Sequence, residues 1–84
     1  MPRTIQISVA QERTGAVLDR IHDVDGVVGI TLQEGASLKP PGDVIIVQTT
    51  NNASRSILHV LDELDVLDGG SILTSELQSL ISRP

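Results

Sequence analysis

The sequence contains no phenylalanine, tryptophan, tyrosine or cysteine, and its one methionine is residue 1. Without cysteine the chain forms no disulfide and offers no thiolate metal ligand or cysteine nucleophile. Without aromatic rings it has no platform on which unpaired nucleic-acid bases stack. The core of this 84-residue chain must therefore be aliphatic, and its length is that of one small domain.

Basic residues are also scarce. Six Lys and Arg residues stand against eleven Asp and Glu residues, which gives a formal net charge of −5. A nucleic-acid-binding domain needs a basic surface to neutralise phosphates, so we expect no nucleic-acid partner.

Long hydrophobic runs are missing as well. The longest aliphatic stretch, Val44–Val47, is far shorter than the ~20 residues that span a bilayer. The first ten residues alternate apolar and polar side chains and do not resemble a signal peptide. We therefore expect the chain by itself to be soluble.

Two periodicities alternate along the chain and predict its secondary structure. Ile5, Ile7 and Val9 alternate with polar residues, which is typical of a strand with one buried face. Spacings of three and four residues between apolar side chains indicate helices elsewhere. The predicted strands cover residues 4–9, 28–32, 44–47 and 71–74, and the predicted helices run from about Glu12 to Asp23 and from a cap at Asn52 to the glycines at 69–70.

This order of elements, β-α-β-β-α-β, predicts an α+β, ferredoxin-like fold. We expect a four-stranded antiparallel sheet with two helices on one face, formed by residues 1–75. Residues 76–84 are predicted to be a C-terminal tail, in which Leu77, Leu80 and Ile81 have the spacing of a short amphipathic helix. A loosely ordered end is the alternative.

The predicted third strand is apolar at four successive positions, 44–47. A strand with apolar side chains on both faces normally has both faces covered. The sequence therefore predicts self-association through the open face of the sheet, and the residues assigned to this interface are Ile45, Val47, Val27 and Leu73. Ordinary exposed apolar surface is the alternative interpretation.

Neither histidine has a convincing catalytic or metal-binding setting. His22 lies beside Asp23 and Asp25, and His59 precedes acidic residues by three and four positions. Both patterns are more typical of a solvated helix surface than of a metal or general-base site. No nucleophile motif or glycine-rich phosphate loop is present, so we expect no enzyme activity, no cofactor and no metal.

The segment "ERTG" lies between the first predicted strand and the first predicted helix. It resembles the acidic-x-x-Gly turn of ACT domains, although Thr14 stands where that family usually has proline. ACT domains share the βαββαβ fold and bind small effectors, often amino acids, at subunit interfaces. The resemblance implies ligand binding near Glu12, Arg13, Thr14 and Gly15. A plain loop is the alternative.

The segment "KPPGD" predicts a stiff corner before the third strand, formed by Pro40, Pro41, Gly42 and Asp43. Residues that precede proline favour extended conformations. Pro41 and Gly42 suit the two central positions of a type II turn, in which glycine supplies the positive φ. The segment carries no nucleophile or phosphate cradle; Lys39 is either solvated or in contact with a partner or lipid headgroup.

The longer stretch "GASLKPPGDVI" resembles the soluble N-terminal segment of hydrophobic bacterial and archaeal membrane proteins grouped as domain of unknown function 389. The matched positions are Gly35, Ala36, Leu38, Pro40, Pro41, Gly42 and Asp43, and "GGSILTSELQSLIS" fits the same family near the end of the chain. The resemblance spans nearly the whole sequence.

This resemblance implies a hydrophobic multi-helix region after Pro84 and a position on the cytoplasmic side of a membrane. The expected function is that of a non-catalytic soluble domain that serves the assembly or regulation of an uncharacterised membrane protein, for which a transporter-like role is often supposed. The alternative is an ACT-like regulatory domain that binds a small molecule.

Overall fold

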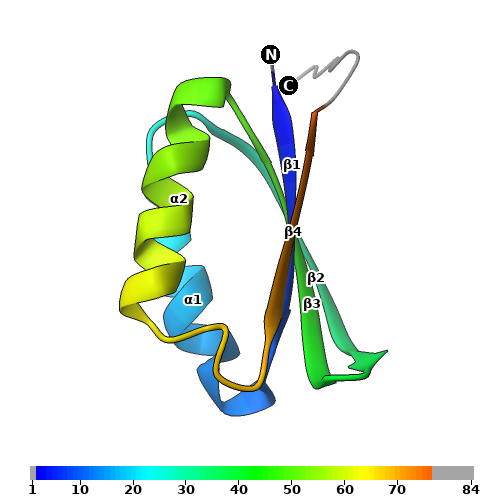
Figure 1. The fold of residues 1–84 in the computed structure, drawn as a ribbon. Coiled ribbons are helices and arrows are strands. Elements are labelled where there is room, and N and C mark those ends of the chain that lie inside the picture. Colours follow the sequence, from blue (N-terminus) through cyan, green and yellow to red (C-terminus); the bar gives the residue numbers. More distant parts are fainter. Residues whose placement is uncertain (1, 77–84) are drawn as a thin grey trace.

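Residues 2–76 form a two-layer α/β domain in the computed structural model, which describes this range of the chain (Figure 1). Two helices pack on one side of a sheet, and the other side of the sheet carries no helix. The elements in order are β1 (Arg3–Val9), the 3₁₀ turn η1 (Gln11–Arg13), α1 (Thr14–Ile21), β2 (Val27–Leu38), β3 (Pro41–Thr49), α2 (Asn51–Glu63) and β4 (Ser71–Glu76).

The strands form one sheet in the order β2-β3-β1-β4, and each neighbouring pair is antiparallel. The two central strands, β1 and β3, are therefore separated in sequence by a helix and an edge strand. The predicted α+β, ferredoxin-like βαββαβ fold is confirmed.

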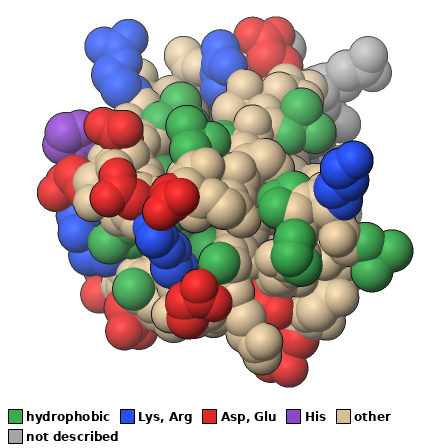
Figure 2. Space-filling model, turned by 60° about the horizontal axis from the view of Figure 1, so that its bottom comes forward, with side chains coloured by type: hydrophobic (Ala, Val, Ile, Leu, Met, Phe, Trp, Pro, Cys, Tyr) green, Lys and Arg blue, Asp and Glu red, His purple; other side chains and the backbone are tan. Residues whose placement is uncertain are grey.

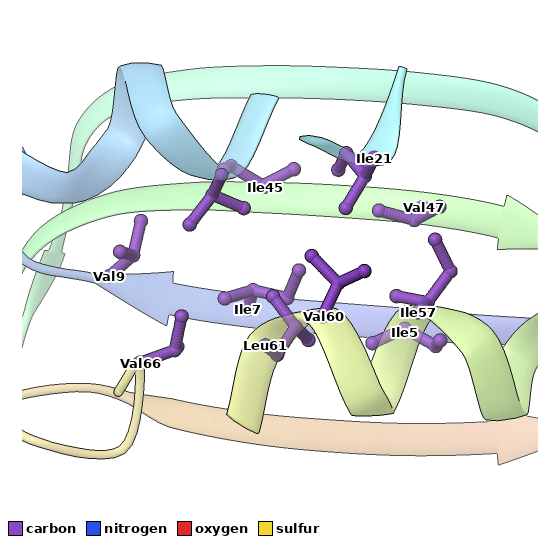
Figure 3. Close-up of a cluster of buried hydrophobic side chains, with 11 residues drawn as sticks. Ile5, Ile7, Val9, Ile21, Ile45, Val47, Ile57, Val60, Leu61 and Val66 are labelled. Atoms are coloured by element: carbon purple, nitrogen blue, oxygen red, sulfur yellow. The ribbon is translucent and has the colours of Figure 1, made fainter. Parts of the chain in front are cut away.

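Aliphatic side chains between the sheet and the helices form the core (Figure 3). Ile5 and Ile7 of β1 pair in register with Val47 and Ile45 of β3, and all four are fully buried. Because directly paired residues share a face, these four side chains point toward the helices. The helices contribute Val17, Ile21, Ile57, Val60 and Leu61 to the same cluster.

This register corrects the predicted open-face interface. Ile45 and Val47 are core residues, so they cannot line an open face in the folded chain. Val27 pairs with the fully buried Thr49 and packs partly buried against the core. Of the four predicted positions only Leu73 lies on the helix-free face, where it is 63% exposed. The error arose because an unbroken aliphatic run does not show which alternate residues point inward.

Both helices lie where the sequence predicted them, but they differ in detail, and α2 ends at Glu63, before the predicted end at the glycines 69–70. Thr50, not Asn52, caps α2: its hydroxyl accepts the backbone N–H of Ala53 at 3.3 Å. The first helix is shorter than predicted, because residues 11–13 form a 3₁₀ turn and α1 ends at Ile21.

The β2–β3 connection is a tight hairpin and not the predicted loop. β2 continues to Leu38, which pairs with Pro41, so Lys39 and Pro40 alone form the turn, with a cis peptide bond between them. The predicted type II turn centred on Pro41 and Gly42 is therefore wrong. β2 also contains an irregularity between Gln33 and Ser37, within which Gly35 adopts a φ of 63°.

Among residues 2–76, no helix has the length and apolar character needed to cross a bilayer. The predicted tail begins inside β4, which extends to Glu76. Its remaining residues, 77–84, and the amphipathic pattern predicted there lie outside the described range.

Candidate functional site

Asp43 links the two segments that the sequence singled out separately. The residue is 5% exposed. It is the third residue of β3, and its side chain lies on the side of the sheet that faces the helices. One carboxylate oxygen, Oδ2, accepts the Thr14 hydroxyl at 2.6 Å, and the other, Oδ1, accepts the Gly35 N–H at 2.7 Å. The start of α1, the bulged part of β2 and the start of β3 are thereby joined at one end of the sheet.

These two hydrogen bonds lower the pKa of Asp43 below its ordinary value of 3.8. The Thr14 hydroxyl has the larger effect and the Gly35 N–H the smaller, while burial acts in the opposite direction. Hydrogen bonds to the ionised carboxylate favour its charged form. Asp43 is therefore a structural anion at neutral pH, with both oxygens engaged.

A shallow depression of about 450 Å³ lies beside this junction. We call it the loop depression; it is lined by Ala10, Gln11, Glu12, Pro40, Pro41, Gly42 and Gly69. It brings together the end of β1, the η1 turn, the hairpin and the loop after α2, all of which lie at the end of the molecule that comes forward in Figure 2. Its walls are mainly apolar and backbone surface, and of the described residues that line it, Glu12 alone is charged.

Gly42 allows the close approach of two backbones in this wall. A Cβ atom at Gly42 would collide with the carbonyl group of Val9 and come within 3.2 Å of the Cα atom of Ala10. The hairpin and the end of β1 can therefore touch only because residue 42 has no side chain.

Arg13 holds the loop after α2 against the η1 turn. Its guanidinium donates to the backbone carbonyls of Leu64 at 3.0 Å and Asp65 at 2.6 Å, and it pairs with the Asp68 carboxylate at 3.2 Å. The last carbonyls of a helix lack partners within the helix and favour a cation. Arg13 therefore closes the α2 terminus and positions Gly69 at the edge of the depression.

The four residues predicted from "ERTG" thus have different surroundings. Glu12 is exposed and lines the depression, whereas Arg13 and Thr14 are engaged by the rest of the fold. Gly15 lies in α1 with no atom within 4 Å of the position its Cβ would occupy. Pro40, Pro41 and Gly42 line the depression, and Asp43 lies beneath it as the link to Thr14.

Both histidines are exposed surface residues that lie beside a carboxylate. His22 Nδ1 lies 3.1 Å from Asp23 Oδ1, and His59 Nε2 lies 3.2 Å from Glu63 Oε1. Within residues 2–76, no three His, Asp or Glu side chains converge as a metal site would require.

A second hollow of about 450 Å³ lies near the start of α2, where the sequence indicated no site. It is lined by Arg3, Asn51, Asn52, Ser54, Arg55 and Leu58. Arg3 Nε donates to Asn51 Oδ1 at 3.0 Å, and the Ser54 hydroxyl donates to the Asn51 carbonyl at 2.7 Å. These contacts organise the helix start and engage its polar groups.

The fold has clear relatives among solved structures. A DUF3240 family protein from Shewanella baltica superposes with a TM-score of 0.81 at 8% identity, covering 99% of this chain and 97% of the other. A nitrogen regulatory PII-like protein, CPII from Thiomonas intermedia, bound to ADP, AMP and bicarbonate, superposes with a TM-score of 0.71 at 20% identity, covering 100% of this chain and 94% of the other. A conserved DUF2179 protein from Eubacterium ventriosum has a TM-score of 0.63 at 19% identity, covering 89% and 99%.

Sequence comparison adds nothing to these structural similarities. No protein-family model matches the chain. No curated protein matches it either. At these identities the structural neighbours establish the fold alone.

The Asp43 junction leads to a first prediction, concerning acid pH. A folded-state pKa that is lowered contributes stability above the unfolded pKa, and that contribution disappears as the pH falls through the folded pKa. Replacing Thr14 by valine removes the main stabilising hydrogen bond, so we expect the pKa of Asp43 to rise in the Thr14→Val variant. A carboxyl-carbon NMR titration measures this shift directly.

The matched control is Thr14→Ser, which keeps the hydroxyl and should keep the pKa of Asp43 low. An Asp43 pKa that is the same in the valine and wild-type proteins would contradict the assigned hydrogen bond.

Proposed function

We propose that this chain is a non-catalytic regulatory domain that binds a small molecule in the loop depression. The observation that carries the proposal is the convergence of three separate loops around one hollow, with Asp43 fixing the two main walls relative to each other. A binding site needs walls that are positioned before the ligand arrives, because ordering them on binding costs free energy.

The composition of the walls favours a particular class of ligand. Pro40, Pro41 and Ala10 offer apolar surface against which a flat or aliphatic group packs, and Glu12 offers a carboxylate that accepts hydrogen bonds. Within residues 2–76, no basic residue belongs to the lining. The recognised part of the ligand is therefore apolar and carries an N–H donor or an amino group, as in an amino acid or a nucleobase.

The structural neighbours support a sensing role without identifying the ligand. CPII has this fold and binds ADP, AMP and bicarbonate. An adenine base would satisfy the two requirements of the depression through its apolar face and its exocyclic amino group. The phosphates of a nucleotide would have to lie beyond the lining. Two basic residues adjoin it in sequence: Lys39 precedes Pro40, and Arg13 follows Glu12 but is engaged by the loop after α2.

A thermal-shift screen against amino acids, nucleobases and adenine nucleotides tests the proposal. Binding to the folded state raises the melting temperature by mass action, and circular dichroism reports it in a chain without tryptophan or tyrosine. We expect Glu12→Gln to weaken the binding of any hit by about ten- to a hundredfold, which corresponds to the loss of a charge-assisted hydrogen bond.

The matched control is Glu63→Gln, the same exchange on the exposed surface of α2. This variant should bind the hit with wild-type affinity. A hit whose affinity falls equally in both variants would bind somewhere other than the depression.

We also propose, on the resemblance described above, that the domain serves a membrane protein on its cytoplasmic side. The proposal rests on the resemblance of the segment "GASLKPPGDVI"; the hydrogen bond from the Gly35 N–H to Asp43 Oδ1 shows that the two ends of this segment meet in the fold. The reading frame downstream of the Pro84 codon tests this proposal. Several hydrophobic spans would support it, and an immediate stop codon would contradict it.

A further inference from the structure

Among residues 2–76, the paired residues on the helix-free face of the sheet carry no charged side chain. Strand pairing arranges its residues in three rows of four across the sheet, on the face opposite to Ile5 and Ile7. From β4 through β1 and β3 to β2, the rows are Ser71–Ser8–Val44–Gln33, Leu73–Gln6–Ile46–Thr31 and Ser75–Thr4–Gln48–Gly29. We call these twelve residues the outer rows.

This distribution of charge is notable in a chain with seventeen charged residues and a net charge of −5. None of the seventeen is in the outer rows. Within the described range they lie on the helices, in the loops, at the ends of strands, in the irregular stretch of β2 (Glu34) and on the helix side of β3 (Asp43). Figure 2 shows acidic side chains crowded on the side that carries the helices. A face of a soluble domain that is exposed to water on its own normally carries some charge.

The outer rows have the chemistry of a surface that pairs with itself. Leu73, at 63% exposed, and the half-buried Ile46 form an apolar centre in the middle row. Around them are Ser, Thr and Gln side chains, each of which both donates and accepts hydrogen bonds. One such pair already exists within the face, where the Thr4 hydroxyl donates to Gln48 Oε1 at 2.8 Å.

We propose that the outer rows are the interface through which two copies of this chain associate. Two copies both carry the net charge of −5, so their other surfaces repel each other, and this face avoids like-charge contacts. The interface differs from the one predicted from sequence, since it uses Ile46 in place of Ile45 and Val47; Val44, in the neighbouring row, is already buried within the chain at 8% exposed. The proposal does not depend on the loop depression, which lies at one end of the sheet.

The size of the face sets the expected strength. Four strands ~4.8 Å apart and six paired residues with a rise of ~3.3 Å outline roughly 19 by 20 Å, or roughly 400 Å² in projection. Stable complexes bury about 800 Å² per partner, and transient ones bury less. The association is therefore weak and depends on concentration, with a dissociation constant above about 1 μM.

Sedimentation equilibrium of the full chain from about 10 μM to 1 mM tests this proposal. We expect the wild-type average mass to rise with concentration. The Leu73→Lys substitution places one ammonium group from each copy in the proposed contact. It should weaken association at least tenfold, because like charges that face each other at an interface are costly. Leu67→Lys is the matched control: Leu67 is 66% exposed, it lies outside the outer rows, and its replacement makes the same change in net charge.

Gln6→Lys provides a second charged variant in the same row, in case the change at Leu73 disturbs the edge strand; far-UV circular dichroism verifies that each variant is folded. Loss of association in both outer-row variants but not in Leu67→Lys supports the proposal. A wild-type chain that stays monomeric at 1 mM overturns it and leaves the face to another segment or protein. Association that survives both outer-row variants also overturns it.

Discussion

Replacing Ile45 by aspartate is expected to unfold the domain, whereas the same substitution at the next residue, Ile46, should leave it folded. Ile45 is fully buried on the helix side of a central strand, and Ile46 is half-buried on the opposite side. An unpaired carboxylate at position 45 costs several kcal/mol in addition to the lost burial of the isoleucine. A domain of 84 residues has a total stability of roughly 4–13 kcal/mol, so the combined loss removes most or all of it.

At position 46 the carboxylate stays in contact with water. The expected cost is about 1–2 kcal/mol, from the poor strand propensity of aspartate and the loss of a partly buried side chain. Far-UV circular dichroism during urea unfolding measures both variants, at a concentration low enough to keep the chain monomeric. Equal destabilisation by the two substitutions would contradict the register of β3.

The second large effect is expected at Gly42. A methyl group at this position collides with the Val9 carbonyl, which is backbone and cannot rotate away, and the residue has a φ of 154°. We expect Gly42→Ala to destabilise the domain by about 2–3 kcal/mol and to distort the loop depression. The expected signature is a lower urea midpoint together with weaker binding of any ligand that the wild-type depression accepts.

Gly15→Ala is the control with the opposite sign. Gly15 is helical and its Cβ position is empty, so alanine should stabilise the domain by about 0.5–1 kcal/mol through a smaller loss of backbone entropy. Wild-type stability in Gly42→Ala would show that the hairpin and β1 do not approach as closely as described.

Local patterns in the sequence were sufficient for the order of the elements and the fold class. The change from a period of two to spacings of three and four residues marks each strand and helix, and it depends only on the neighbours of each residue. The faces of β3 could not be read in the same way. Four successive aliphatic residues fit either orientation, and only pairing with Ile5 and Ile7 decides between them.

The candidate site was harder to predict because its parts are distant in sequence. Thr14 and Asp43 are separated by 29 positions, and their hydrogen bond exists only when α1 packs beside the hairpin. One signal was present: Asp43 has the same parity in the sequence as Ile45 and Val47. Once those two residues are assigned to the core, the carboxylate must also point inward, and a buried carboxylate needs hydrogen-bond partners.

The central claim is that the loop depression binds a small molecule, and backbone amide NMR during titration with a screening hit tests it most directly. The claim predicts that chemical-shift changes concentrate at Gln11, Glu12, Gly42 and Gly69, with Gly35 following through its bond to Asp43. Changes confined to the second hollow, around Arg3 and Asn51, would contradict it, as would a complete absence of saturable shifts across the amino acids, nucleobases and nucleotides of the screen.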